Sequence, residues 1–380
     1  MKIDEKKSNL EIAEIADRFN EKYRKNTVLY SRTGLFFVGL MEKVHVWEYS
    51  NEEILRAYHN AKQSIVTIDT FDGIGLFGYS LYLLKNRFDD QIYTNQIKHI
   101  ENIYVNYLDG VDISKFSDLD LFKNITAIVR FLIFIKSNYL LSSHFKQKYE
   151  KMLDVILQVN YQNLNFGFSH GLSGVLNFIT ICEQEHIGSH LRNIQIIQFL
   201  FDLIYKNRVK FNNMYIFPVR KENSISVLSN SYPLSWCYGL AGITLSLVSA
   251  SDILGLNEEK EDLINNFIKM VKTEGILETF KSHMFCHGIG GLIVVLDQLI
   301  SKNKQDKDQL EECHELVLEK EFKSIKDNKN QFLNYDLNNE KKLVCTKIND
   351  SLINGNMSCI LSLLNCYDED KIYGKITCIS

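Results

Sequence analysis

Hydrophobic positions follow two alternating patterns along most of this chain. One places apolar residues every three or four positions, the period of a helix with one buried face, and it is clearest in QIKHIENIYVNYL, KQKYEKMLDVILQV and KEDLINNFIKMVK. The other is a run that is apolar almost throughout, as in VLNFIT and LIVVLDQLI, which is typical of a helix buried on every side. The alternation predicts pairs of helices, each made of an outer amphipathic helix and an inner apolar one.

A motif of small residues three positions apart opens the apolar runs. Clear copies begin at Gly75, Gly171, Gly239 and Gly288, and weaker copies begin at Asn124 and Gly355. Successive starts lie 49, 47, 68, 49 and 67 residues apart, and units of this length that bury their faces only against neighbours indicate a repeat architecture. If the set closes on itself, six to seven helix pairs form a double-layered α/α toroid. We predict one such domain over residues 1–380.

Two stretches depart from the helical pattern. Residues 28–50 and 207–222 are rich in β-branched and aromatic residues, and we expect small insertions there with short strands or hairpins. The charged segment 302–350 is expected to form an outer helix followed by long loops.

Composition and charge narrow the fold class and the classes of partner. The chain has 380 residues, 45% hydrophobic, and only 2 prolines, so it buries a large core and long stretches are free to be helical. We therefore expect an all-α protein. A net charge of −4 offers no basic footprint for nucleic acid. Since no signal peptide and no apolar run of about 18 residues is visible, we expect a cytoplasmic protein without a membrane span.

Reactive side chains stand immediately before three of the glycine motifs. The three junctions are Ser169-His170-Gly171, Trp236-Cys237-Tyr238-Gly239 and Phe285-Cys286-His287-Gly288. All would lie at inner-helix starts, which a toroid directs toward one mouth. Two cysteines and a histidine are soft ligands that suit Zn²⁺, and three protein ligands leave a fourth position open, as in catalytic zinc sites. Two donating thiolates also keep a further bound thiolate electron-rich, which suits thiol activation.

The remaining cysteines and histidines have a structural interpretation. Eight cysteines scattered over a long chain indicate free thiols. Cys313 and His314 are adjacent but lie in a charged amphipathic stretch, so we place them on the surface of an outer helix. Cys359 and Cys366 are interpreted as core residues, and His283 is given no role in the site.

At these motifs the chain resembles a known family, the stand-alone lanthipeptide cyclases or LanC-like proteins, from about residue 70 onward. The segments that carry the resemblance are SHGLSGVL, SWCYGLAGI and FCHGIGGL. It implies an α/α toroid with seven inner helices and a zinc ion bound by Cys237, Cys286 and His287.

The resemblance also implies two residues for proton transfer. His170 corresponds to a histidine that donates or accepts a proton near the metal, and Asp120 to an acidic residue that orients or polarises it. One position departs from the family pattern: where relatives often carry an arginine, four residues before the first cysteine ligand, this chain has Pro233. Backbone N–H groups at the helix starts or Arg220 are the candidates for stabilising an enolate in its place.

The function implied is that of a zinc-dependent lanthionine synthetase cyclase. Such an enzyme adds peptide cysteine thiolates to dehydroalanine or dehydrobutyrine and forms thioether rings in a lanthipeptide precursor, with no organic cofactor. The implied partners are a dehydrated precursor peptide with its leader, a separate dehydratase and an exporter, through which the protein would lie at the membrane periphery. The alternative is a non-catalytic, zinc-bound scaffold that binds peptide within a modification complex.

Overall fold

The computed structural model describes most of the chain, in two compact units. The described residues are 12, 14–16, 18, 32–65, 67–112, 124–158, 165–218, 233–327, 335–337, 343–345 and 356–377. Unit 1 combines Met1–Ile100 with Glu274–Ile379, and unit 2 comprises Glu101–Thr273 together with Ser380.

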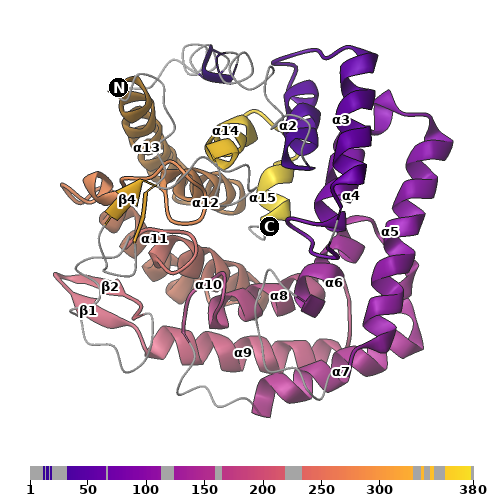
Figure 1. Ribbon diagram of the computed structural model, residues 1–380. Helices are drawn as coiled ribbons and strands as arrows, with labels where there is room; N and C mark the ends of the chain where they lie inside the picture. Colours follow the sequence, from indigo (N-terminus) through magenta and orange to yellow (C-terminus); the bar gives the residue numbers. More distant parts are fainter. Residues whose placement is uncertain are drawn as a thin grey trace. The chain divides into compact units, whose positions relative to one another are not determined.

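The described part of unit 1 is built around four apolar helices, α2 (Arg32–Lys43), α4 (Ile74–Leu83), α12 (Ile289–Lys302) and α14 (Asn356–Asn365). They pack in the order α4, α2, α14, α12, each against the next (Figure 1). Amphipathic helices cover them: α3 (Asn51–Gln63) packs on α2, and α13 (Lys307–Asp327) packs on α12. The remaining elements are η2 (Lys85–Arg87), η7 (Leu277–Thr279), β3 (Tyr335–Leu337), β4 (Leu343–Cys345) and α15 (Ile372–Ile376), while α5 (Asp90–Gly110) begins in unit 1 and ends in unit 2.

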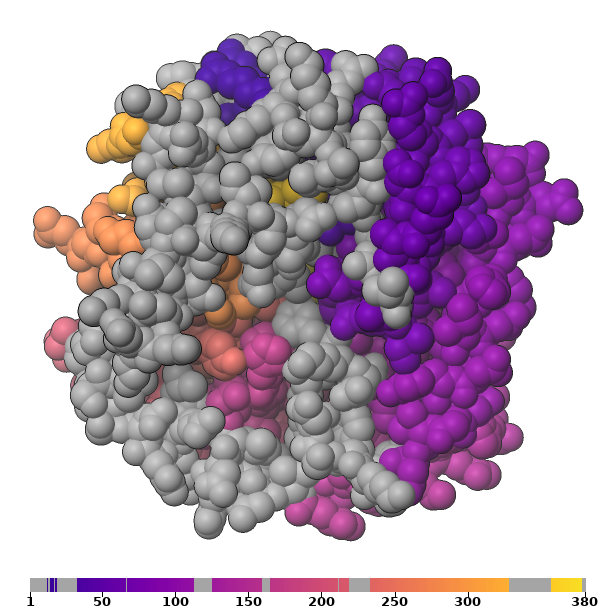
Figure 2. All heavy atoms as spheres, in the orientation of Figure 1, coloured from indigo at the N-terminus to yellow at the C-terminus, as the bar shows by residue number. Residues whose placement is uncertain are grey.

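Helix α3 illustrates the predicted outer face. A capping box fixes its start, because the Ser50 hydroxyl accepts from the Glu53 N–H while the Glu53 carboxylate accepts from the Ser50 N–H. Ile54 and Ala57 are buried and Arg56 is exposed. The outward side chains of α3 appear in indigo in Figure 2.

Unit 2 repeats the alternation of apolar and amphipathic helices. Its helices are α6 (Asn124–Phe134), η4 (Asn138–Leu141), α7 (Ser143–Gln158), α8 (Leu172–Gln184), α9 (His190–Lys206), α10 (Leu240–Leu254) and α11 (Asn257–Val271). Helix α10 packs against α8, α9 and α11, and it is buried along nearly its whole length. The weaker motif copies predicted from the sequence do open apolar helices, since α6 begins at Asn124 and α14 at Asn356.

The predicted insertion near residues 207–222 contains a β-hairpin. Strands β1 (Val209–Phe211) and β2 (Met214–Ile216) pair antiparallel, with Val209 opposite Ile216. The hairpin is fastened to α11 by both polar groups of the Asn266 side chain, which bond the Tyr215 N–H at 2.7 Å and its carbonyl at 2.8 Å.

The strands predicted near residues 28–50 are a wrong prediction, because Arg32–Lys43 forms helix α2. Residues 33–41 are buried without interruption, so no polar stripe marks a 3.6-residue period. Its β-branched and aromatic side chains were therefore misleading.

The placement of Cys313 and His314 on an outer surface is also wrong: Cys313 is fully buried on the face of α13 that packs on α12, with Leu310 and Val317. Across the described residues, no helix is both long enough and apolar enough to cross a membrane.

Helix α10 approaches the preceding chain closely at Gly242. A Cβ added there would lie 2.1 Å from the Trp236 carbonyl oxygen and 2.7 Å from Phe168 Cβ. We predict that Gly242→Ala lowers the free energy of unfolding by about 1–3 kcal/mol, because the backbone itself must shift to admit the methyl group. Denaturant unfolding measures this change.

Gly110→Ala is the matched control, since nothing lies within 4 Å of a Cβ at Gly110. It is expected to leave stability unchanged or to raise it by up to about 1 kcal/mol. Equal effects of the two substitutions would contradict the packing account of Gly242.

Candidate functional site

Four of the described apolar helices begin at the end of the same seven-residue turn. We call these segments glycine turns; they span residues 67–73, 165–171, 233–239 and 282–288. In each, the N–H that follows the final glycine donates to the carbonyl of the first residue. These bonds are Ile74 N to Thr67 O at 3.1 Å, Leu172 N to Asn165 O at 3.0 Å, Leu240 N to Pro233 O at 2.8 Å and Ile289 N to Ser282 O at 3.1 Å.

The last position of each turn requires glycine. A Cβ there would lie 2.4–2.8 Å from the carbonyl oxygens of the first and third residues of its own turn, in all four cases. Backbone oxygens cannot rotate away as a side chain can, so a larger residue would break the turn. In the first turn this glycine is Gly73, two residues before the Gly75 at which the sequence motif was read.

Equivalent turns give equivalent positions to the side chains that precede the glycine. The fifth residues are Phe71, Ser169, Cys237 and Cys286, and the sixth residues are Asp72, His170, Tyr238 and His287. The two candidate cysteine ligands therefore occupy the same place in two different turns. The two candidate histidines likewise share the next place.

In unit 2, backbone hydrogen bonds join the turn that carries His170 to the turn that carries Cys237. The Cys237 carbonyl accepts from the N–H groups of Phe168 at 2.7 Å and Ser169 at 3.2 Å. The Cys237 side chain is buried and that of His170 is exposed. The His170 ring lies 6.1 Å from the ring of Tyr238, measured between centroids.

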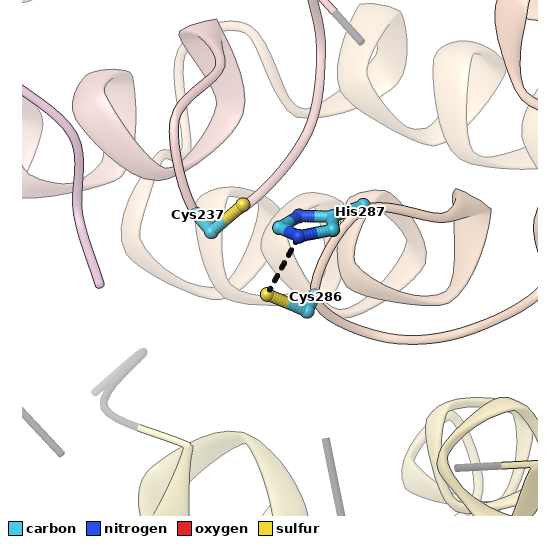
Figure 3. Close-up of side chains that lie close together, drawn as sticks. All are labelled: Cys237, Cys286 and His287. Atoms are coloured by element: carbon cyan, nitrogen blue, oxygen red, sulfur yellow. Dashed lines mark hydrogen bonds between the residues drawn. The ribbon is translucent and has the colours of Figure 1, made fainter. Parts of the chain in front are cut away.

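In unit 1, Cys286 and His287 stand side by side before α12. Cys286 Sγ lies 3.9 Å from His287 Nε2 (Figure 3, which also draws Cys237). Zinc bonds of about 2.3 Å to sulfur and 2.0–2.1 Å to nitrogen place two ligand atoms of one tetrahedral ion about 3.5 Å apart. The pair is thus spaced as neighbouring ligands of one ion, and its donor atoms fit Zn²⁺.

Two further sets of potential ligands lie in unit 1, and the sequence had indicated neither. In the first, His283 Nδ1 lies 2.8 and 2.9 Å from the two oxygens of Glu321, which is hydrogen-bond length and shorter than the separation of two ligands on a metal. In the second, built on Asp297, the Lys371 ammonium lies 3.4 Å from the carboxylate. The positive charge of Lys371 would repel a metal ion at this carboxylate.

Pro233 opens its glycine turn, and its carbonyl bond to Leu240 requires neither an N–H nor a side chain. Because proline carries no charge, this position supplies no cation. Asp120 and Arg220 lie outside the described residues.

Asn165 is a site residue that the sequence reasoning missed. Its side-chain oxygen accepts from the Gly167 N–H at 2.9 Å, and its amide donates to the His170 carbonyl at 2.8 Å, so it holds the turn around His170. The signal was available, since asparagine commonly bonds to the backbone two residues on.

We predict that Asn165→Ala destabilises the protein by about 1–2 kcal/mol through the loss of these two bonds and speeds amide hydrogen exchange at Gly167. Exchange mass spectrometry checks the site. Asn207→Ala, which removes a single bond to Leu203 at the end of α9, is the control and should leave exchange at Gly167 unaltered. Unchanged exchange in Asn165→Ala would contradict the bracing role.

Comparison with known proteins agrees with these motifs. Among solved structures, one named nisin cyclase matches with a TM-score of 0.65 at 14% identity, over 99% of this chain and 98% of that one. The likeness shows the fold. It confirms the predicted fold class, which is all-α and of the double-layered α/α toroid type. A search of curated protein sequences finds no match. A family profile described as Lanthionine synthetase C-like protein matches residues 34–325, and the chain therefore belongs to the lanthionine synthetase C-like family.

Proposed function

We propose that this protein is a zinc-dependent lanthionine-forming cyclase. It would close thioether rings in a lanthipeptide precursor by adding cysteine thiols to dehydroalanine or dehydrobutyrine. Family membership supports the reaction class. The observation that carries the proposal is the placement of Cys237 and Cys286 at the same position of two glycine turns, with His287 Nε2 at ligand spacing from Cys286 Sγ.

Cys237, Cys286 and His287 are the proposed zinc ligands. When bound there, zinc would lower the pKa of a coordinated substrate thiol and so supply a thiolate at neutral pH. The burial of both cysteines keeps bulk water away from their sulfur atoms. The three-ligand set leaves one position open for the substrate.

His170 is the proposed proton carrier. In the addition, the thiolate sulfur forms a bond to the β-carbon of the dehydrated residue, and the electron pair of its carbon–carbon double bond is displaced to form an enolate. The reaction ends when the α-carbon is protonated. This proton replaces the one that the substrate thiol lost, so no net proton is consumed. An exposed imidazole, whose ring nitrogens can both donate and accept a proton, suits this exchange. The hydrogen bonds from Phe168 and Ser169 to Cys237 hold the His170 turn beside that ligand.

The remaining site and partner assignments are part of the same proposal. Asp120 would orient or polarise His170, and either N–H groups at the helix starts or Arg220 would stabilise the enolate. The substrate would be a leader-bearing precursor dehydrated by a separate enzyme, with an exporter as a further partner. In the alternative, the protein is a scaffold that binds zinc and the peptide but does not catalyse the addition.

We predict that Cys237→Ala and Cys286→Ala each abolish stoichiometric zinc binding and thiol consumption. Metal content is measured by mass spectrometry of the purified protein, and thiol consumption by alkylation after incubation with a dehydrated, cysteine-containing peptide. Cys182→Ala is the matched control, because Cys182 is equally buried but lies within α8. It should retain both properties.

Either of two results would contradict the proposed ligand set: Cys237→Ala and Cys286→Ala both retain zinc, or Cys182→Ala loses zinc to the same extent as they do. Zinc binding without thiol consumption in the unaltered protein would favour the scaffold.

We predict that His170→Asn retains zinc but slows ring formation by about 10²–10⁴-fold, because it removes proton transfer and leaves the ligands in place. Single-turnover ring formation, with metal content measured on the same sample, tests this. An unchanged rate would exclude His170 as the proton carrier.

A further inference from the structure

Glu321 is a carboxylate enclosed in the core of unit 1. It lies within α13, is 1% exposed, and uses both oxygens: they lie 2.8 and 2.9 Å from His283 Nδ1, and one also accepts from Cys359 Sγ at 3.0 Å. A buried carboxylate is costly unless it is paired and hydrogen-bonded. The three side chains come from a glycine turn, α13 and α14, so the network joins three separate elements.

The glycine turn in this network is the one that carries Cys286 and His287. His283 is its second residue. In the other three glycine turns the second residue is apolar, and these residues are Ile68, Phe166 and Leu234. A polar tether at this position therefore distinguishes the turn with the paired candidate ligands from the other glycine turns described.

A second bond fastens the same turn to α14. The Phe285 N–H, adjacent to Cys286, donates to Ser358 Oγ at 3.0 Å. The Phe285 ring meets the Tyr373 ring edge-on, with centroids 5.4 Å apart. The turn is thus held from two helices, by Glu321 of α13 and by Ser358 of α14.

The protonation states fit a hydrogen-bonded tether. Burial alone lowers the pKa of His283, but the charge and hydrogen bond of Glu321 outweigh it and raise that pKa above its ordinary value. Burial, with Glu321 beside it, holds the pKa of the Cys359 thiol well above its ordinary value. Cys359 therefore remains a protonated S–H donor rather than a thiolate ligand.

We infer that Glu321 and His283 are positioning residues for the zinc site: they fix the turn so that Cys286 and His287 reach the same ion without rearrangement. The inference rests on the proposed function. A pre-positioned pair loses less conformational freedom on binding metal, so the tether acts on zinc affinity.

The test compares Glu321→Gln with His314→Gln in the full chain. Both side chains lie on α13 and are largely buried, but His314 faces Asp297 and Cys366 rather than the turn. Zinc affinity is measured by competition with a chromogenic chelator. Absorption of the cobalt(II)-substituted protein reports ligand geometry independently of activity.

Glu321→Gln is expected to weaken zinc binding about tenfold or more and to change the cobalt spectrum, while His314→Gln changes neither. Equal effects of the two substitutions, or none, overturn the positioning role. Should Glu321→Gln fail to fold, His283→Gln, which retains a donor toward Glu321, carries the same comparison. Absence of zinc from the unaltered protein would overturn the proposed function itself, whereas unaltered affinity in Glu321→Gln overturns the tether alone.

Discussion

The close contact between a glycine and two carbonyl oxygens of its own turn is the constraint on which the site depends. A Cβ at Gly239 or Gly288 would lie 2.4–2.8 Å from backbone oxygens that cannot move aside. Each glycine therefore fixes the path of the six residues before it and the start of the helix after it. Because the path repeats, Cys237 and Cys286 occupy equivalent places in their two turns.

The glycine turns share one backbone path but are braced differently. In unit 2 the Cys237 carbonyl accepts two N–H groups from the His170 turn, and the Asn165 side chain braces the His170 turn from within. In unit 1 the bracing comes from side chains, with Glu321 and Ser358 holding the turn from two helices. Backbone bracing tolerates sequence change, whereas the side-chain bracing depends on individual residues. The effects of substitution should therefore be concentrated at the residues whose side chains brace a turn.

Much of the fold could be predicted from the sequence, for identifiable reasons. Apolar runs opened by small residues gave α8, α10 and α12, because glycine at a helix start and uniform burial leave a direct mark on the sequence. Helix α2 was missed, since its uninterrupted burial removes periodicity and its Phe and Val residues favour strands as readily as helices.

The site was predictable only in part. The cysteines before Gly239 and Gly288 and the histidines before Gly171 and Gly288 stood out, because a reactive side chain beside a repeated motif is recognisable in the sequence alone. The pairing of His283 with Glu321 joins residues 38 positions apart, and nothing in either local sequence indicates the other. Such contacts depend on which helices pack together, which the repeat pattern did not specify in detail.

X-ray absorption at the zinc edge of the purified protein would test the central claim most directly. The account predicts two sulfur ligands at about 2.3 Å together with nitrogen or oxygen ligands at about 2.0–2.1 Å, and a substrate thiol added to the sample should raise the sulfur count by one. A zinc shell without sulfur, or one with four protein ligands that does not change when the thiol is added, would contradict it.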